Sequence, residues 1–399
     1  MVGGSASGFF TAKLLAQAGR RVCVLERETA LNPLPRTLIV TTHFRKLLGG
    51  TAECAIVNEI RRFELFADGR TATVPLREPD LMIERTALIR RLAAEAEAAG
   101  AEILYGRRFI GLGADGEFAR VRMERDAGAP ECWHAATVVG ADGAFSHVAR
   151  AAGWPAQPTV PLVQARVRWP ENIPSDTVRV WFIPEDTPYF YWLMPESPTH
   201  GVLGLIGEDG RETRRCLERF LKTQGLAPLN FQGARIPRYA RWIPVHRRVG
   251  KASVYLVGDA AGQVKVTTVG GIVTGFRGAA GVAEAILNGG ASSELGALRR
   301  ELDLHLWIRR AMHHFQQDDF VRLFDLLHPP AVQPLGAYHR DAAARMLWRL
   351  CLRQPRLILF GLRALLTGDR SPAVRPPAAK PAGAEALPGS EALETSSDG

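Results

Sequence analysis

The 399-residue chain has 46% hydrophobic and 23% charged residues, which is the composition of a folded protein. Its 50 Lys and Arg against 41 Asp and Glu give a net charge of +9, which admits nucleic acid, anionic lipid or phosphorylated ligands as partners. The five cysteines are odd in number and show no CxxC spacing, which disfavours a disulfide framework and a zinc site and fits a reducing cytosol. There is no signal-peptide pattern and no apolar run of about 18 residues, so secretion and a spanning helix are disfavoured.

A glycine-rich turn near the start predicts a phosphate-binding β-turn-α-β unit. The turn spans residues 3–8, residues 9–18 are compatible with a helix that Gly19 ends, and residues 21–25 have the pattern of a short buried strand. Such a turn normally follows a buried strand of about five residues. Only Met1 and Val2 precede it here, so we expect a misplaced start codon or a truncated first strand.

The rest of the chain alternates between helix and strand patterns and then becomes helical. Residues 85–100 predict a helix, whereas 102–105, 118–123 and 137–140 predict strands. Between 158 and 244 there are short β-like runs with many prolines and aromatic residues, which indicate an antiparallel sheet in a substrate domain.

These patterns predict an α/β fold, with a Rossmann-like nucleotide-binding domain, an inserted antiparallel β-sheet domain and a helical C-terminal region. The tail has no aromatic residues and is rich in Pro, Ala, Ser and Glu, which predicts disorder. The expected divisions are a first nucleotide-binding part at 1–157, the β-rich domain at 158–244, a second nucleotide-binding part at 245–290, the helical region at 291–370 and the tail at 371–399.

The opening turn has the residue types that a pyrophosphate site needs. Gly3 permits the tight turn, the small Ser5 lets the backbone approach the phosphates, and Gly8 allows the helix to pack closely on the strand. Ser7 lies in the same turn, and the helix N-terminus adds free N–H groups and a positive dipole end. Glu26 ends the second strand, where a carboxylate can bind an adenosine ribose. The unit predicts FAD or NAD, and an ordinary glycine-rich turn is the structural alternative.

Two later motifs each end a strand pattern with an acid. Asp142 and Gly143 follow the pattern at 137–140, and Asp259 follows the one at 254–258. A carboxylate there can accept hydrogen bonds from ribityl hydroxyls or hold a loop around a diphosphate, although each motif alone fits a structural turn equally well. With the opening turn, and in this order, they resemble the FAD-binding signatures of the para-hydroxybenzoate hydroxylase-type flavoproteins. The resemblance implies FAD as the cofactor.

Within that superfamily, residues 258–278 resemble the geranylgeranyl reductase family. They read GDAAGQVKVTTVGGIVTGFRG, and family members often have GDAAG, then a Lys/Pro-Thr-Thr segment, then a glycine run and Ile. The resemblance implies that Asp259 contacts the ribityl or phosphate part of FAD. It also implies that the amides of Gly270, Gly271 and Ile272 meet the pyrimidine edge of the flavin, where positive potential stabilises the reduced form.

The sequence departs from the family at several places, among them Met194, which stands where the aromatic segment of the family has Phe. Val266 stands at the usual proline and Val269 at the first glycine of the run. Several members carry a cysteine in the loop after the ribose-binding glutamate, but residues 32–37 contain none. The sequence therefore names no proton donor, and the catalytic residues stay unassigned.

Two arginines are assigned to the cofactor through the same resemblance. Arg85 matches the arginine that precedes a helix in the family and is expected near the flavin diphosphate. Arg36 is expected against the flavin, as an arginine is in the wider fold. A solvated arginine at a helix start is the alternative for Arg85.

An aromatic segment is similar to the one that lines the substrate side in these reductases. Residues 188–195 read PYFYWLMP, so that Phe190, Trp192 and Met194 alternate along a strand pattern. Such side chains can wall a long apolar cavity suited to an isoprenoid chain. An aromatic strand in the core explains the pattern equally well.

Three other motif matches are rejected. The GxGxxG letters at 111–116 are followed by a strand pattern and no helix, which predicts a hairpin turn. The His and Asp residues at 313–319 are helix neighbours without a further ligand set, which disfavours a metal site. Ser146 and His147 are adjacent and do not face each other as a nucleophile and its base would.

Residues 340–370 carry seven arginines and two aspartates among many apolar side chains, with Pro355 expected to divide two helices. Arg345, Arg349 and Arg353 are four residues apart and share a helix face. Basic amphipathic helices of this kind can lie on an anionic membrane surface, which favours a lipid partner over nucleic acid. C-terminal helices packed on the catalytic domain are the equally weighted alternative.

The expected function is the FAD-dependent reduction of carbon–carbon double bonds in a geranylgeranyl or polyprenyl chain. NAD(P)H or a ferredoxin-like protein is the expected electron donor. The protein is expected in the cytoplasm, and peripheral contact with the inner face of the membrane is the further option. The alternatives are an FAD monooxygenase that hydroxylates an aromatic or lipid substrate, because the same FAD signatures serve both, and a flavin-free scaffold at the membrane surface. The sequence does not indicate the oligomeric state.

Overall fold

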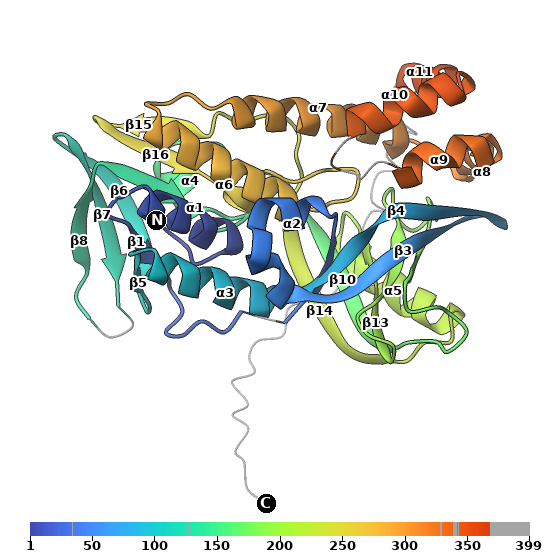
Figure 1. The fold of residues 1–399 in the computed structure, drawn as a ribbon, viewed down its shortest axis with the longest axis horizontal. Coiled ribbons are helices and arrows are strands. Elements are labelled where there is room, and N and C mark those ends of the chain that lie inside the picture. Colours follow the sequence, from blue (N-terminus) through green and yellow to red (C-terminus); the bar gives the residue numbers. More distant parts are fainter. Residues whose placement is uncertain (34, 126–127, 328, 338–340, 342, 368–399) are drawn as a thin grey trace, which may run out of the picture.

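The computed structural model has a mixed α/β fold in which helices join two regions of β-sheet (Figure 1). It confirms the predicted α/β class with an inserted sheet and C-terminal helices. The expected tail at 371–399 lies outside the described residues. The structure describes residues 1–33, 35–125, 128–327, 329–337, 341 and 343–367.

Two short sheets of the first region, one of two parallel strands and one of three mixed strands, meet at Val2. Val2 forms parallel bridges with Leu25 on one side and with Gly140 on the other. Its amide donates to the Val139 carbonyl at 2.8 Å, and the Leu25 amide donates to the Met1 carbonyl at 2.9 Å. Two residues therefore occupy the place of a central strand. On one side lies β1 (Cys23–Leu25), which pairs with β5 (Glu102–Leu104). On the other side lies β9 (Thr137–Gly140), which pairs with β16 (Ala252–Leu256), and β16 also pairs with β15 (His246–Val249).

Helices cover one face of this region and a three-stranded sheet covers the other. The helices are α1 (Ala6–Gln17), α3 (Arg85–Ala98) and α6 (Ile272–Leu287), whose apolar sides share one core with α2 (His43–Leu48) and the 3-10 helix η1 (Gly49–Ala55). Phe10 of α1 and Phe276 of α6 meet edge to face, with ring centroids 5.2 Å apart. The opposite layer consists of β6 (Arg108–Asp115), β7 (Phe118–Glu124), β8 (Glu131–Ala135) and the short helix α4 (His147–Ala151).

The hairpin predicted in place of the GxGxxG match is confirmed. Strands β6 and β7 pair antiparallel, and Gly116 at their turn has φ of 58°. No helix follows the turn, so its amides do not form a phosphate site.

The second region is an eight-stranded sheet. Five strands come from the predicted β-rich segment, and the other three come from residues 37–84. The pairs are antiparallel except that β11 runs parallel to β3, which differs from the all-antiparallel sheet that we predicted. In spatial order the strands are β14 (Pro228–Pro237), β10 (Thr159–Arg168), β13 (His200–Ile206), β12 (Tyr191–Pro195), β11 (Thr177–Trp181), β3 (Ile56–Ala67), β4 (Arg70–Glu84) and β2 (Thr37–Val40).

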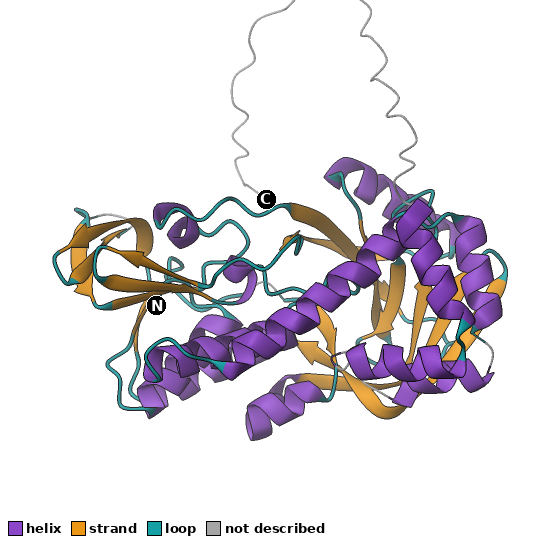
Figure 2. Cartoon of the chain, turned by 90° about the horizontal axis from the view of Figure 1, so that it is seen from above, coloured by secondary structure: helices purple, strands orange, loops and turns teal. Residues whose placement is uncertain are grey.

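Helices lie on both faces of the eight-stranded sheet. Helix α5 (Gly210–Thr223) packs on one face through Cys216, Leu217 and Phe220. The long helix α7 crosses from one sheet region to the other (Figure 2). The C-terminal helices are α7 (Ser293–His313), α8 (Gln317–Leu326), α9 (Pro329–Ala337), α10 (Ala343–Arg353) and α11 (Arg356–Thr367), and the break between the last two confirms the division expected at Pro355. Over the described ranges, no helix combines the length and the apolar character that crossing a membrane requires.

Gly204 in the middle of β13 tests the packing of the eight-stranded sheet. A Cβ at this position would lie 2.6 Å from both the Gln164 Cβ and the Trp192 ring, so Gly204→Ala should lower the free energy of unfolding by about 1–3 kcal/mol. Gly233→Ala on the edge strand β14 is the control, because its Cβ would meet nothing closer than the Leu162 carbonyl oxygen at 3.7 Å. Urea unfolding of both variants measures the difference, and equal stabilities would contradict the packing described here.

Candidate functional site

A cavity of about 900 Å³ lies between the opening turn, the eight-stranded sheet and the C-terminal helices. This volume is within the usual range of small-molecule sites, about 300–1,000 Å³. It brings together residues that lie far apart in the sequence. The predicted site residues that line it are Ser5, Ser7, Arg36, Arg85, Gly143, Phe190, Trp192, Met194, Asp259, Gly270, Gly271 and Ile272.

Four predicted residues, Gly3, Gly8, Glu26 and Asp142, are not among the residues that line the cavity, although they contact segments that do. Gly3 has φ of 97°, and a Cβ there would lie 2.6 Å from the Ala141 carbonyl oxygen. The backbone approach requires glycine at this point. A Cβ at Gly8 would likewise collide with the Gly3 carbonyl oxygen.

The two acids of this group hold loops through backbone amides. Glu26 accepts hydrogen bonds from the Gly4 amide at 2.6 Å and from the Glu28 amide at 3.0 Å. Asp142 accepts from the Ser146 hydroxyl at 2.6 Å and from the His147 amide at 2.7 Å, which anchors the start of α4. Of the two roles expected for Asp142, holding a loop is the one that these contacts provide.

The N-terminus of α1 faces the cavity. Ser5 caps this helix, and its hydroxyl accepts a hydrogen bond from the Gly8 amide at 3.1 Å. Ser7 packs against Gly258 and Gly275. A Cβ added at Gly258 would lie 2.8 Å from the Ser7 hydroxyl oxygen, and a Cβ added at Gly275 would lie 2.7 Å from it. Gly258 itself has φ of 61°. Small residues therefore let α1, α6 and the 3-10 helix η2 (Gly258–Ala261) approach one another closely.

The N-terminus of α6 faces the same cavity. Gly271 is the N-cap residue, so no side-chain oxygen caps the first amides of the helix. Gly270, Gly271 and Ile272 all line the cavity wall. Uncapped amides at a helix N-terminus carry a partial positive charge and bind acceptors or anions.

Two arginines add positive charge to the same end of the cavity. Burial lowers the pKa of Arg36, and the neighbouring Arg85 lowers it further, while Asp259 acts in the opposite direction. Burial also lowers the pKa of Arg85 and raises the pKa of Asp259. The Nε of Arg36 is buried without a hydrogen-bond partner among the described residues. Two cations and two helix N-termini against one carboxylate leave a site that favours an anion.

The aromatic segment forms a wall of the cavity farther along. On β12 and the residue before it, the Phe190 and Trp192 rings meet edge to face, with centroids 6.1 Å apart, and Met194 follows on the same side. The Trp192 Nε1 is buried and has no hydrogen-bond partner in the part of the chain that the structure describes.

Sequence reasoning missed a hydroxyl–imidazole–carboxylate series beside the cofactor end. The Thr267 hydroxyl lies 2.7 Å from Nδ1 of His305, and both residues line the cavity. His305 is 4% exposed, and its Nε2 lies 3.5 Å from Oε1 of Glu301. Thr267 stands in the quoted 258–278 stretch, but 38 residues separate it from His305, so no sequence pattern pairs them.

A buried ion pair joins the cofactor end to the C-terminal region. Lys265 lines the cavity and pairs with Asp341, and the Thr41 hydroxyl donates to the same carboxylate. The side chains of Lys265 and Asp341 are 7% and 1% exposed. Breaking a pair at this depth would leave an uncompensated charge, so the contact holds these segments together.

Comparison with known proteins identifies relatives of this chain. A family model described as FAD binding domain matches residues 1–296. The chain is 28% identical over 209 residues to the digeranylgeranylglycerophospholipid reductase of Methanocaldococcus jannaschii, an alignment that covers 48% of this chain and 51% of that protein. The reductase of the same name from Methanoculleus marisnigri is 25% identical over 294 residues, which cover 68% of this chain and 72% of the relative.

Solved structures share the fold. A geranylgeranyl bacteriochlorophyll reductase-like protein from Thermoplasma acidophilum superposes with a TM-score of 0.75 at 17% identity, covering 91% of this chain and 98% of that one. The p-nitrophenol 4-monooxygenase PnpA from Pseudomonas putida DLL-E4 gives 0.60 at 20% identity, covering 91% and 96%. The flavin-dependent brominase Bmp2 gives 0.64 at 14%, covering 91% and 98%. One fold thus carries several flavin chemistries.

The residues at the positive end of the cavity fit FAD. Its diphosphate is an anion, which suits the two arginines and the α1 N-terminus, and its pyrimidine edge has acceptors that suit the amides opening α6. The buried and unpartnered Nε of Arg36 is a donor that such a group would satisfy. The individual assignments of Glu26, Asp142 and Asp259 to parts of FAD stay predictions.

Arg85→Gln tests the anion end of the site. Loss of a charge-assisted contact costs about 1.5–3 kcal/mol, so the dissociation constant for FAD should rise at least about tenfold. Arg90→Gln on the same helix is the matched control, because Arg90 is exposed and its Nη2 donates to Oδ1 of Asn32 at 3.4 Å. Visible absorbance of the purified proteins and fluorescence titration with FAD measure the effect. Equal affinities in the two variants would remove Arg85 from the site.

Proposed function

The chain belongs to the FAD binding domain family and is an FAD-dependent oxidoreductase, and we propose that it reduces carbon–carbon double bonds in a polyprenyl chain. The two archaeal relatives carry the name of digeranylgeranylglycerophospholipid reductases, and both alignments support this class of substrate. The cavity is the observation that carries the proposal.

The cavity suits a long apolar substrate because apolar side chains line it from the cofactor end to the C-terminal helices. Strands of the eight-stranded sheet supply one side, and helices α7, α8, α10 and α11 supply the other. Each methylene-sized group buried there would contribute about 0.8 kcal/mol, so apolar contacts alone can hold several isoprene units. Examples from the two sides are Phe63, Val178 and Phe190, and Met312, Leu347 and Phe360.

The residues near the cofactor end supply the proton that the reduction requires. FAD, when bound and reduced, supplies hydride chemistry to one carbon of the double bond. The other carbon needs a proton, which the Thr267 hydroxyl can give while it takes one from Nδ1 of the His305 imidazolium. The ring is then neutral, with its remaining proton on Nε2, which lies 3.5 Å from Oε1 of Glu301, and a proton must return to Nδ1 before the next turnover. Glu301 lies on the Nε2 side of the ring, opposite the hydroxyl of Thr267.

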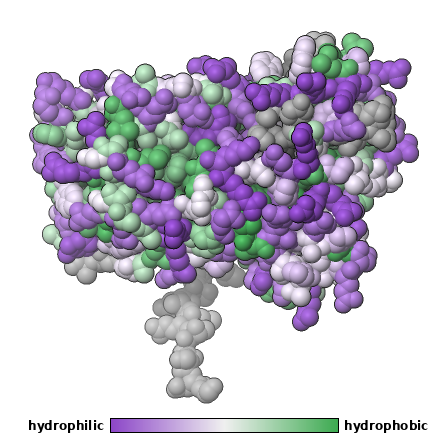
Figure 3. Space-filling view, in the orientation of Figure 1, coloured by the Kyte–Doolittle hydropathy of each residue, from purple (hydrophilic) through white to green (hydrophobic). Residues whose placement is uncertain are grey.

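A peripheral membrane contact is part of the proposal, because a polyprenyl lipid resides in a bilayer. The space-filling view shows apolar atoms over the C-terminal helices among hydrophilic ones (Figure 3). The exposed fractions of Trp348 on α10 and Leu359 on α11 are 67% and 70%. Their arginine neighbours match an anionic surface in charge.

An anaerobic single turnover tests the proposed reaction. The protein is reduced with dithionite, NADPH or reduced ferredoxin in parallel and is then mixed with a geranylgeranyl-bearing lipid. We expect reoxidation of the flavin absorbance and a lipid whose mass has increased by two hydrogen atoms per double bond. If the lipid stays unsaturated while an aromatic or lipid substrate stimulates oxygen uptake in air, the protein is a monooxygenase and the proposal is wrong.

Thr267→Val tests the proton route. The variant keeps the side-chain shape but lacks the hydroxyl, and it should slow the reduction of the lipid by about 100-fold, the usual scale of a lost general acid. Thr267→Ser is the matched control and should keep most of the rate. FAD content should stay the same in both, and long-range imidazole NMR of the FAD-free protein should show a loss of the His305 Nδ1 hydrogen bond in Thr267→Val alone. Equal rates in the two variants would exclude this route.

A further inference from the structure

The sheet wall of the cavity carries a polar pair, Gln164 on β10 and Trp192 on β12. Their exposed fractions are 2% and 6%, and both line the cavity. A carboxamide and an indole N–H that are buried in an apolar wall lower the stability of the fold unless a partner satisfies them. The other residues that strands β10 to β13 contribute to the lining are all apolar, namely Leu162, Val178, Val180, Met194 and Ile206.

Gly204 brings the polar pair together. It is the cross-strand neighbour of both residues, and a Cβ added to it would lie 2.6 Å from the Gln164 Cβ. The same Cβ would lie 2.6 Å from Cζ2 of Trp192 and 2.8 Å from Cε2, the ring carbon that is bonded to Nε1. The N–H edge of the indole therefore lies over Gly204, on the side of Trp192 that faces Gln164.

Hydrogen bonding leaves one donor and one acceptor in the polar pair. Nε2 of Gln164 donates to Oε1 of Gln232 on β14 at 2.8 Å, which orients the amide. Among the hydrogen bonds of the described residues, none involves the Gln164 Oε1 or the Trp192 Nε1. The pair thus offers an N–H and a carbonyl oxygen side by side.

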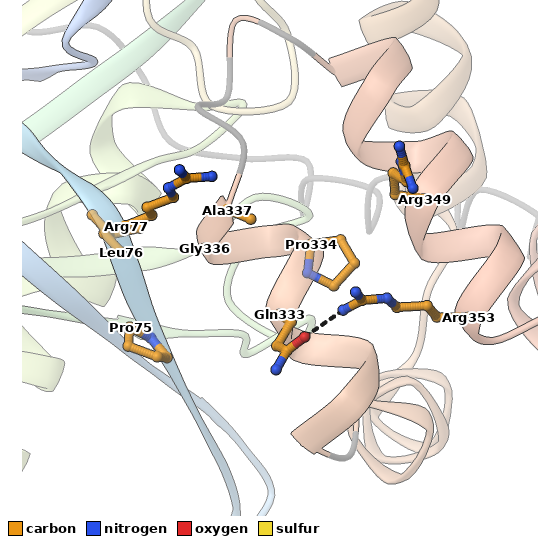
Figure 4. Close-up of a pocket in the computed structure, with 9 residues that line it drawn as sticks. All are labelled: Pro75, Leu76, Arg77, Gln333, Pro334, Gly336, Ala337, Arg349 and Arg353. Carbon is orange, nitrogen blue, oxygen red and sulfur yellow. Dashed lines mark hydrogen bonds between the residues drawn. The ribbon is translucent and has the colours of Figure 1, made fainter.

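The polar groups of a second, smaller hollow are satisfied in a different way. This hollow has a volume of about 360 Å³ and lies between β4, α9 and α10 (Figure 4). Gln333 on α9 accepts a hydrogen bond from Nη1 of Arg353 at 2.6 Å, and both residues are exposed, so water reaches them. Trp192 is buried, so a molecule inside the cavity must accept from its Nε1.

We propose that Gln164 and Trp192 bind a hydroxyl group of the substrate. The hydroxyl oxygen accepts from Trp192 Nε1, and the hydroxyl proton is donated to Oε1 of Gln164, so one group satisfies both side chains. A carbonyl or ether oxygen satisfies only the indole. A charged group would lose its hydration without a counter-charge, because strands β10 to β13 contribute no charged side chain to the lining.

The polar pair lies toward the cofactor end of the cavity. Trp192 belongs to the same buried cluster as Val264 and Val269, which stand next to the glycines that open α6. The hydroxyl is therefore bound close to the reacting part of the substrate and fixes its position along the apolar wall. The assignment to a prenyl substrate rests on the proposed function, whereas the binding of a hydroxyl does not.

Binding of three matched ligands to the FAD-loaded protein tests the polar pair. Geranylgeraniol carries a hydroxyl, its methyl ether can only accept, and the hydrocarbon of the same chain has no oxygen. We expect the alcohol to bind about tenfold more tightly than the hydrocarbon, the effect of one neutral hydrogen bond, and more tightly than the ether. The change in flavin absorbance on binding measures each affinity. Equal affinities for the three ligands would mean that the pair holds water only, and would overturn the proposal.

Trp192→Phe and Gln164→Met each remove one partner and keep most of the side-chain volume. Both should abolish the preference for the alcohol over the hydrocarbon. Because the two ligands are compared in the same protein, a changed fit of the apolar chain affects both alike. Trp181→Phe is the matched control, since Trp181 on β11 packs against Phe66 and Phe220 and does not line the cavity. A preference that survives in both cavity variants, or an equal loss in the control, would contradict the proposal.

NMR of the protein labelled at tryptophan nitrogen reads the contact directly. The indole N–H signal that is missing from Trp192→Phe should move downfield when geranylgeraniol is added. The hydrocarbon should not cause this shift, because it offers no acceptor. An indole signal that responds alike to the two ligands would remove Trp192 from the hydroxyl site.

Two further arms separate this inference from the proposed function. If geranylgeraniol and the hydrocarbon are reduced with equal kcat/KM, the reduction of prenyl chains stands and the hydroxyl site is wrong. If no prenyl chain is reduced, while an alkylphenol stimulates oxygen uptake and its binding depends on Trp192 and Gln164, the hydroxyl site stands and belongs to a phenol. The proposed function is then the part that fails.

Discussion

The close backbone contact among α1, η2 and α6 is the constraint on which the cofactor end of the cavity depends. A side chain larger than serine at position 7, or any Cβ at Gly258 or Gly275, would separate these elements. Because they approach so closely, the N-termini of α1 and α6 open onto one space instead of two. The same contact brings Asp259, in η2, between the α6 N-terminus and the two arginines. The electrostatics of the site therefore follow from the packing of small residues.

That geometry costs stability when no anion is bound. Arg36 and Arg85 are desolvated and repel each other, and Asp259 compensates only part of their charge. A ligand that binds only the folded chain stabilises it by mass action, so a diphosphate at this end would support folding as well as function. The β1–β5 and β9–β16 pairs, which residues 1–3 join through backbone hydrogen bonds, depend on the same ligand-facing turn.

Sequence patterns predicted the parts of the molecule whose signals are local. The opening turn, the helix from Arg85 and the stretch from Gly258 carry their own spacing of glycines and acids, and the structure brings most of the residues assigned from them to one cavity. Contacts between distant segments carry no such signal. Neither the parallel pairing of β11 with β3 nor the approach of His305 to Thr267 follows from any periodicity. Val269 lies between these two cases. The sequence shows that it stands in a glycine run, and the structure adds that its φ of 50° is the left-handed conformation that glycine would adopt there.

The chemistry that distinguishes a reductase from a monooxygenase in this fold lies away from the FAD signatures. Both classes need the anion end, because both hold the same diphosphate, and a shared fold at 14–20% identity reflects that common requirement. The differences must arise where the substrate lies: in the length of the apolar wall, the donors that face it and the helices that close it. Here the wall extends past Trp192 to helices that begin after residue 292, so the C-terminal region, which lies beyond most of the matched family model, forms part of the wall that a substrate of the proposed kind would contact.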